Sequence, residues 1–232
     1  MEKQKYAAIV LAAGSGKRMN SKVHKQYLII QDRPVLYYSL KAFEDSAVDE
    51  IVLVVGKGEE EFCRKEIVDK YGISKVKAIV EGGKERYHSV FEGLKQTSDA
   101  DYVLIHDGAR PFVNQDIIRR CMQEVQKYQA CVVGMPVKDT IKIADEEGYA
   151  KQTPDRKNVW MIQTPQTFSY ALIYEAYGEM LKTEDTAITD DAMVLERIEG
   201  KKSKLIEGSY RNIKITTPED LLIANVYLQH PE

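Results

Sequence analysis

A glycine-rich segment with nearby cations is the first part of the sequence that could do chemistry. Residues 12–19 read AAGSGKRM directly after an apolar run, and Lys25 follows a few residues later. A glycine-rich turn at the end of a strand lets several backbone N–H groups point at one anion, with Gly14 and Gly16 free to adopt positive φ. Arg18 and Lys25 add two cations that suit a triphosphate whose α-phosphorus gains charge during displacement.

This segment matches neither of two common nucleotide-binding motifs. It is not GxxxxGK[ST] and it is not GxGxxG, so neither a P-loop ATPase nor a nicotinamide-dependent enzyme is favoured. A plain strand-to-helix turn with surface lysines remains the alternative interpretation of this segment alone. Further polar loops are needed to decide between the two.

A second polar segment follows another apolar run. Residues 81–90 read EGGKERYHSV. Gly82 and Gly83 allow close approach of the backbone, and Arg86 and Ser89 supply hydrogen-bond donors near the start of a predicted helix. These features could bind a polar ligand.

The third polar segment is HDGARPF, residues 106–112. Asp107 can accept a hydrogen bond from a ribose hydroxyl or help to hold Mg²⁺, and Arg110 can bind an anion through two N–H groups. His106 is better explained as a packed histidine than as a reactive one. All three polar segments follow predicted strands, so they are expected to face one crevice.

The elements that position these segments alternate between strand and helix. Short apolar runs near residues 7, 50, 76, 102 and 131 predict buried strands. Helical periodicity separates them, with Leu36, Leu40 and Phe43 on one face and Ile117, Cys121 and Val125 on another. This alternation predicts an α/β fold with a mostly parallel central sheet, helices on both faces, and ligands at the carboxyl ends of the strands.

Two later segments depart from this alternation. Residues 137–163 read as two extended stretches around the turn candidate EEGY, which predicts a β-hairpin protruding from the main sheet. The last segment predicts a helix, because Thr217 suits an N-cap and Pro218 the first helical position. Its apolar face is expected to include Leu221, Leu222, Ala224 and Leu228.

Composition excludes several classes of protein. With 232 residues and 44% hydrophobic residues, the chain is expected to form one domain, residues 1–232. A net charge of −3 with scattered lysines indicates no nucleic-acid partner, and the apolar runs are too short to cross a membrane. Cys63, Cys121 and Cys131 lack paired metal-ligand spacing, which favours core thiols in a reducing, cytoplasmic compartment.

The order of the polar segments makes a family resemblance specific. Eight segments occur in the order seen in the methylerythritol phosphate cytidylyltransferases: AAGSGKRM with its following lysine, GGKERYHSV, HDGARPF, PVKDTIK, TPDRKNVW, QTPQTF, ITDDAMVLE and NIKITTPEDL. The match covers nearly the whole chain. Many nucleotidyltransferases share the first loop, whereas the eight segments together are typical of this family. The resemblance implies a Rossmann-like nucleotidyltransferase fold with a protruding β-hairpin arm at 137–163.

The resemblance also implies a role for each polar residue. Arg18 and Lys25 are expected to stabilise the pentacoordinate transition state at the α-phosphorus of CTP. The residues expected to bind CTP are Ala12, Ala13, Gly14, Gly16, Gly83, Lys84, Ser89, Asp107 and Gly108. The residues expected to position the sugar-alcohol phosphate are Arg110, Thr140, Arg156, Thr164, Thr189 and Lys214. No residue is assigned as a metal ligand, since Mg²⁺ is expected to be held mainly through the CTP phosphates.

The implied reaction transfers CMP from CTP to 2-C-methyl-D-erythritol 4-phosphate and releases pyrophosphate. The attacking phosphate oxygen is already anionic near neutral pH, so no general base is expected. The resemblance further implies a homodimer in which the arm is exchanged. Two alternatives remain: a cytidylyltransferase acting on ribitol 5-phosphate, and a nucleotide-binding module without catalysis.

Three positions depart from the family pattern. His24 stands where proline is common, Lys84 where an acidic residue is frequent, and His88 where aspartate is common.

Overall fold

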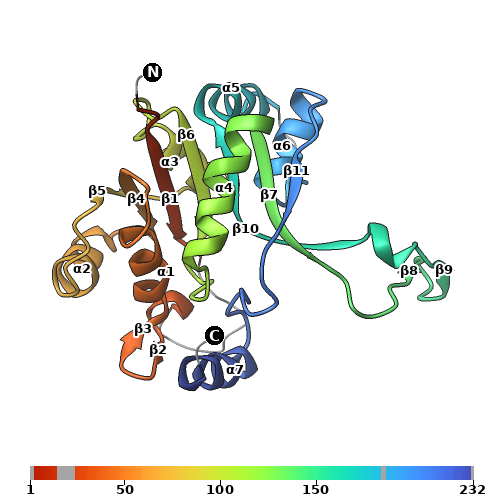
Figure 1. The fold of residues 1–232 in the computed structure, drawn as a ribbon, viewed down its shortest axis with the longest axis horizontal. Helices are drawn as coiled ribbons and strands as arrows, with labels where there is room; N and C mark the ends of the chain where they lie inside the picture. The colour runs from red at the N-terminus through yellow and green to blue at the C-terminus, as the bar shows by residue number, and fades with distance from the viewer. Residues whose placement is uncertain (1–2, 15–23, 184–186, 231–232) are drawn as a thin grey trace.

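The computed structural model describes residues 3–14, 24–183 and 187–230. Seven strands form one sheet in the order β11-β7-β10-β6-β1-β4-β5 (Figure 1). The strands are β1 (Tyr6–Ala12), β4 (Glu50–Val55), β5 (Val76–Glu81), β6 (Tyr102–Asp107), β7 (Ala130–Pro136), β10 (Trp160–Ser169) and β11 (Lys204–Glu207). Only β10 runs antiparallel to its neighbours within this sheet of described residues. The predicted α/β fold with a mostly parallel sheet is confirmed.

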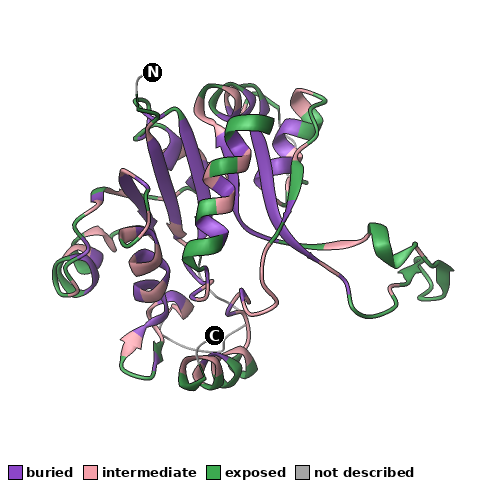
Figure 2. Cartoon of the chain, in the orientation of Figure 1, coloured by how far each residue is buried: buried purple, intermediate pink, exposed green. Residues whose placement is uncertain are grey.

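Helices cover both faces of the sheet. One face carries α1 (Val35–Glu44), α2 (Glu60–Cys63) with its π-helical continuation η3 (Arg64–Asp69), and α4 (Gln115–Tyr128). The other face carries α3 (Arg86–Leu94), α5 (Tyr170–Met180) and α6 (Asp191–Ile198). Within β1, Ala8 and Val10 pack on the first face and Ala7 and Ile9 on the second. Because both faces are covered, the central strands are continuous apolar runs rather than alternating ones (Figure 2).

Local signals explain where two helices begin. The Asn114 side chain accepts a hydrogen bond of 3.0 Å from the backbone N–H of Ile117 at the start of α4. Thr217 and Asp220 form a capping box at the start of α7 (Pro218–Gln229), as the sequence predicted for Thr217. The predicted apolar face of α7 is partly wrong: Ala224 is buried, but Leu222 is 70% exposed. The covered side of α7 packs against Ile30 in the small sheet of β2 (Ile29–Ile30) and β3 (Arg33–Pro34), and against Val35 and Ile215.

The chain leaves the sheet after β7 and returns at β10, forming an arm (Figure 1). Its hairpin strands, β8 (Ile143–Ala144) and β9 (Ala150–Gln152), are much shorter than the predicted extended stretches, and the 3-10 helix η4 (Arg156–Asn158) follows them. Residues 160–163 belong to β10, and 160–162 pair with β7, so the last part of the predicted hairpin lies in the main sheet. The arm is almost entirely exposed (Figure 2).

Sequence reasoning did not predict β10, β11, α5 or α6. The segment of β10 reads WMIQTPQTFS, in which proline and alternating glutamine and threonine weaken the strand signal. Tertiary pairing on both sides of β10 overrides that weak signal.

Within the described residues, no helix has the length and apolar character that a membrane span requires. Cys63, Cys121 and Cys131 are all buried free thiols, as predicted.

Candidate functional site

A crevice lies at the carboxyl ends of the strands, where the strand order reverses. The chain proceeds from β1 to β4 and β5 on one side, and then crosses through α3 to β6 on the other side of β1. Ligands of open α/β sheets bind at such switch points, because the loops diverge there. A hollow of about 370 Å³ occupies this position.

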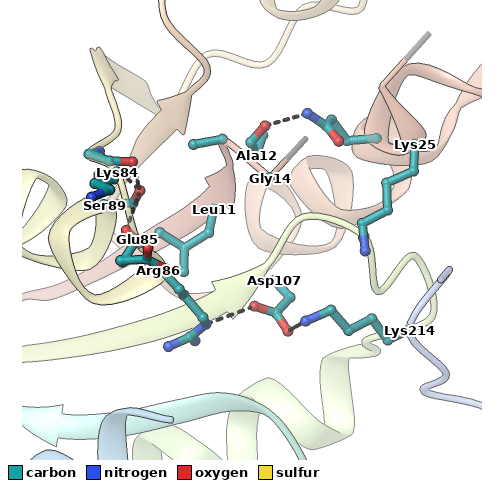
Figure 3. Close-up of a pocket in the computed structure, with 14 residues that line it drawn as sticks. Leu11, Ala12, Gly14, Lys25, Lys84, Glu85, Arg86, Ser89, Asp107 and Lys214 are labelled. Atoms are coloured by element: carbon teal, nitrogen blue, oxygen red, sulfur yellow. Dashed lines mark hydrogen bonds and ion pairs between the residues drawn. The ribbon is translucent and has the colours of Figure 1, made fainter. Parts of the chain in front are cut away.

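Most of the predicted nucleotide site lines this hollow. The predicted residues in the lining are Ala12, Ala13, Gly14, Lys25, Gly83, Lys84, Ser89, Asp107 and Lys214 (Figure 3). Lys25 comes from the 3-10 helix η2 (Lys25–Tyr27), and Lys214 comes from the segment before α7. In Figure 3, Lys25 and Lys214 enter the crevice from the same side. The three polar segments therefore meet at one crevice, as the sequence predicted.

The loop after β5 packs tightly against the loop after β1. A Cβ atom placed on Gly82 would lie 2.6 Å from the Cβ of Ala13 and 2.6 Å from the Ser89 hydroxyl oxygen. The predicted need for glycine here is confirmed, because no side chain fits between these loops. The Ser89 hydroxyl oxygen accepts a hydrogen bond of 3.1 Å from the backbone N–H of Gly83. Gly14 does not use the positive φ that its sequence context permits.

The His88 departure has a local structural role. The backbone N–H of Glu85 donates to His88 Nδ1 over 3.2 Å, and the Glu85 side chain accepts from the backbone N–H of His88. This reciprocal capping box satisfies two backbone donors at the start of α3. An aspartate at the same position offers the same kind of acceptor. His88 therefore stabilises the start of α3, the helix that borders the nucleotide side of the crevice.

Asp107 is surrounded by three cations. Its carboxylate lies 2.8 Å from Lys214 Nζ, 3.4 Å from Arg86 Nε and 3.8 Å from Arg110 Nε. Burial alone would raise the pKa of Asp107, but Arg86, Lys214 and Arg110 outweigh it and hold that pKa far below its usual range. Asp107 is therefore an ionised group that orients cations around the crevice.

Arg86 is fixed by a buried carboxylate that sequence reasoning did not single out. Its guanidinium donates two hydrogen bonds of 2.8 Å to Asp191, whose side chain has no exposed surface. The Tyr177 hydroxyl donates to the same carboxylate over 2.6 Å. Burial would lower the pKa of Arg86, but Asp191 and Asp107 raise it well above its usual value. The Arg86 side chain is thus a permanent cation held across two elements.

A second hollow, of about 310 Å³, adjoins the first. It contains the predicted acceptor-binding residues Arg110, Thr164, Thr189 and Lys214. Arg86, Asp107 and Lys214 line both hollows, so charged groups stand at their junction. Arg110 Nη1 donates 2.8 Å to the Asn212 carbonyl, which holds its guanidinium against the segment before α7.

Thr164 and His106 form part of the wall rather than a free recognition surface. The Thr164 hydroxyl accepts from the backbone N–H of Asp107 over 3.1 Å and lies 3.1 Å from His106 Nδ1. Burial lowers the pKa of His106 to about 4, partly opposed by the charge of Asp107. The prediction that His106 is packed is confirmed, and it is neutral at physiological pH.

Three further predicted site residues, Thr140, Arg156 and Gly108, line neither hollow. Thr140 and Arg156 are on the exposed arm, where Arg156 donates to the Lys138 carbonyl over 2.9 Å. Gly108 lines neither hollow; its N–H donates to the Leu11 carbonyl, and a Cβ there would lie 2.9 Å from that oxygen. Gly16 and Arg18 lie outside the described residues.

Five residues that line the first hollow were absent from the predicted site residues: Leu11, Gln26, Glu85, Arg86 and Ala109. Arg86 was noticed as a donor but given no role, and Asp191 was overlooked within the segment ITDDAMVLE. The signal for Asp191 was a pair of adjacent aspartates before an apolar helix. Asp190 alone explains the helix cap, because it accepts from the backbone N–H of Met193. The second aspartate was therefore available for an ion pair.

Relatives with known names match this chain along nearly its whole length. A protein from Lachnospira eligens, 2-C-methyl-D-erythritol 4-phosphate cytidylyltransferase, is 54% identical over 224 residues, 96% of this chain and 98% of the relative. The protein of that name from Lachnoclostridium phytofermentans is 50% identical over 97% of each chain. The crystal structure of 4-diphosphocytidyl-2C-methyl-D-erythritol synthase from Anaerococcus prevotii superposes with a TM-score of 0.86 at 38% identity, covering 98% of this chain and 97% of that one. The family model for 2-C-methyl-D-erythritol 4-phosphate cytidylyltransferase matches residues 6–230, and the chain belongs to this family.

Proposed function

We propose that the two adjoining hollows hold CTP and 2-C-methyl-D-erythritol 4-phosphate, between which the chain carries out the cytidylyl transfer of its family. The main support for this proposal is that both hollows share three charged lining residues, Arg86, Asp107 and Lys214. Two anionic substrates that must approach each other need cations at the junction. The same junction carries one ionised carboxylate, which keeps those cations in place.

The larger hollow suits the nucleotide. Backbone groups of residues 12–14 and 82–85 approach each other closely there, and glycines leave the backbone accessible. Lys25 and Lys84 line the same space and supply positive charge for the phosphates. We assign CTP binding to these segments together with Ser89 and Asp107. The family resemblance extends the assignment to Gly16, which lies outside the described residues, and to Gly108, which lines neither hollow.

The smaller hollow suits the sugar-alcohol phosphate. Arg110 and Lys214 provide cations for the phosphate, and Thr189 offers a hydroxyl to the sugar oxygens. In the reaction, a phosphate oxygen of the acceptor attacks the α-phosphorus of CTP in line. The bond to the β-phosphate breaks and pyrophosphate leaves. Lys25, with Arg18, stabilises the charge that develops on the phosphoryl oxygens.

The crevice fits a magnesium ion that is held mainly by phosphate. Among the described residues, no three acidic, histidine or cysteine side chains gather as a metal-binding group. Asp107 is the ionised carboxylate at the junction, and Glu85 is engaged in capping α3. Asp107 is therefore the residue that could contribute an oxygen to Mg²⁺, with the other ligands from CTP and water. The ion would supply charge neutralisation along the triphosphate.

The test is pyrophosphate release from CTP in the presence of each acceptor. We expect release with 2-C-methyl-D-erythritol 4-phosphate and Mg²⁺, and none with CTP alone. EDTA should abolish release while leaving the melting temperature unchanged, because the described residues contain no cluster of acidic, histidine or cysteine side chains that would hold a structural metal. Faster release with ribitol 5-phosphate would favour the ribitol enzyme, and no release with either acceptor would favour a non-catalytic module.

We also propose a homodimer in which the arm of residues 137–163 embraces the partner. A protruding two-stranded ribbon is marginally stable alone, and this one exposes Ile143 and Tyr149, the latter by 70%. Met161 and Ile162 at the root of the arm are also exposed. A two-fold interface would cover this apolar surface twice, once on each subunit. In such a dimer, Thr140 and Arg156 serve the acceptor site of the other subunit.

Subunit mixing tests this arrangement. Lys25→Ala subunits are exchanged with Arg156→Ala subunits, and turnover of the mixture is measured. If sites are shared, one site of each mixed dimer carries both changes and the other carries neither. Activity should then rise towards about a quarter of the wild-type value, because roughly half the dimers are mixed and half their sites are intact. No recovery despite demonstrated exchange would place Arg156 at the site of its own subunit.

We further propose that residues 1–232 act as one nucleotidyltransferase domain in the cytoplasm. The single seven-stranded sheet supports the first statement. Three buried free thiols suit a reducing compartment, which supports the second.

A further inference from the structure

The short segment that carries Lys25 is tied on both sides to one carboxylate, that of Glu59. The Tyr27 hydroxyl donates to Glu59 Oε2 over 2.7 Å. His24 Nδ1 lies 2.7 Å from the other oxygen, Oε1, and forms an ion pair with it when the imidazole is protonated. Tyr27 and His24 stand on either side of Lys25 and Gln26 along the chain. One side chain therefore holds both ends of the turn that presents Lys25.

Glu59 is itself held in place. The backbone N–H of Gly56 donates to Glu59 Oε2 over 3.0 Å. A Cβ on Gly56 would lie 2.7 Å from that same oxygen, so a larger residue at this position would displace the carboxylate from its present place. Glu59 immediately precedes α2, and Gly56 immediately follows β4. The carboxylate is thus anchored to the end of a buried central strand.

Tyr27 connects the anchored Glu59 carboxylate to the turn that carries Lys25. Its ring packs edge-on against Phe62, with 5.1 Å between ring centroids, and its hydroxyl oxygen lies 3.1 Å from Cys63 Sγ. Burial, followed by the neighbouring Cys63 and Glu59, raises the pKa of Tyr27 far above its usual range. The hydroxyl therefore keeps its proton and remains a donor to Glu59.

A third contact fixes the turn from inside the crevice. Gln26 is only 2% exposed, and its side-chain amide donates to the Ala12 carbonyl at the end of β1. The turn is consequently fastened to β1 through Gln26 and to the loop after β4 through Glu59. Lys25, between these contacts, points into the hollow assigned to CTP.

We propose that Glu59 is a positioning residue, which sets the place of Lys25 at the α-phosphorus by holding both flanks of its turn. The inference rests on the proposed role of Lys25. It extends the site to a carboxylate that lines neither hollow. Charge-assisted hydrogen bonds restrict geometry strongly, and a displacement of about 1 Å at a reacting group can cost on the order of 100-fold in rate.

The first test is Glu59→Gln, with Glu61→Gln as the matched control. Glutamine keeps the shape but removes the negative charge that lies beside His24 Nδ1 and weakens the acceptor for Tyr27. We expect kcat to fall about 10-fold while KM for CTP stays within about 2-fold, because an interaction needed mainly in the transition state is disturbed. Glu61 is exposed and forms a surface ion pair with Lys65, so its variant should behave as wild type. Equal rates for the two variants would overturn the proposal.

A double-mutant cycle then separates positioning from general weakening. In the Lys25→Ala background, Glu59→Gln should cause less than about 2-fold further loss, because its effect passes through Lys25. A full additional 10-fold loss would show that Glu59 acts independently of Lys25. If Lys25→Ala alone has no effect, the role assigned to Lys25 fails instead, and the two failures are thereby distinguished.

Tyr27→Phe provides a second variant in case Glu59→Gln folds poorly. It keeps the ring against Phe62 and removes only the hydroxyl that reaches Glu59. We expect a smaller fall in kcat, about 3-fold, because His24 and Gln26 still hold the turn. This fall should likewise disappear in the Lys25→Ala background. A fall that persists there would contradict the proposed route through Lys25.

Discussion

Lys25→Ala is expected to lower kcat about 100-fold or more, which corresponds to about 3 kcal/mol of lost transition-state stabilisation. The affinity for CTP should change much less, because the contact of Lys25 with the phosphoryl oxygens strengthens as charge develops on them. The side chain enters the crevice from a turn fastened at both flanks, so its position is set before the substrate binds. Single-turnover rates and CTP binding, measured separately, check both parts of this expectation.

A surface lysine gives the matched control for this substitution. Lys65 is exposed and pairs with Glu61 within one helical turn, so Lys65→Ala should leave turnover unchanged. Both variants should keep the wild-type melting temperature. Near-normal turnover in a stably folded Lys25→Ala protein would show that the glycine-rich segment and its lysine do not act on the α-phosphorus.

The sequence predicted correctly those features that depend on residues close to one another in the chain. The buried strands β1, β4, β6 and β7 are predominantly apolar runs that contain valine or isoleucine, a pattern typical of strands covered on both faces. The shorter apolar run at β5 was also predicted, although that strand is only partly buried. The cap of α7 at Thr217 was also predicted correctly, because it depends on residues within one helical turn. Since the carboxyl ends of parallel strands share one edge, the meeting of three polar loops also followed from the strand assignments.

Sequence reasoning failed where position depends on distant partners. The long strand β10 was missed because its glutamine and threonine side chains become buried only through pairing with β6 and β7. Leu222 was placed on the covered face of α7, yet periodicity cannot say how wide a stripe the neighbours cover. Asp191 lies 105 positions from Arg86 in the chain, and no spacing rule connects them. The network that orients the crevice cations was therefore visible only in three dimensions.

Asp191→Asn is expected to lower the free energy of unfolding by about 3 kcal/mol. Breaking a buried ion pair by removing one partner typically costs about 3–5 kcal/mol, because the other charge stays uncompensated. Here the lower end applies, since the Arg86 side chain is 30% exposed and Asp107 remains close to it. Asparagine keeps the size of the side chain, so the lost stability reflects the removed charge rather than a change in packing. Urea denaturation monitored by circular dichroism measures it directly.

A surface pair provides the comparison for this loss. Asp116 and Arg119 form an ion pair of 2.6 Å on α4, with both side chains well exposed. Asp116→Asn should therefore cost less than about 1 kcal/mol. If the two aspartate variants lose equal stability, Asp191 is not the buried counterion of Arg86 that the geometry indicates.

A double variant shows whether the uncompensated charge causes the loss. Arg86→Met removes the cation and keeps an unbranched apolar side chain in its place, so Arg86→Met with Asp191→Asn should recover part of the stability lost in Asp191→Asn alone. Activity should not recover with it, because Arg86 lines both hollows and stands 3.4 Å from Asp107 at their junction. Restored stability without restored turnover would separate two roles of this ion pair. In the fold, each partner neutralises the buried charge of the other. In the crevice, Asp191 holds the Arg86 guanidinium at the junction where the two anionic substrates must meet.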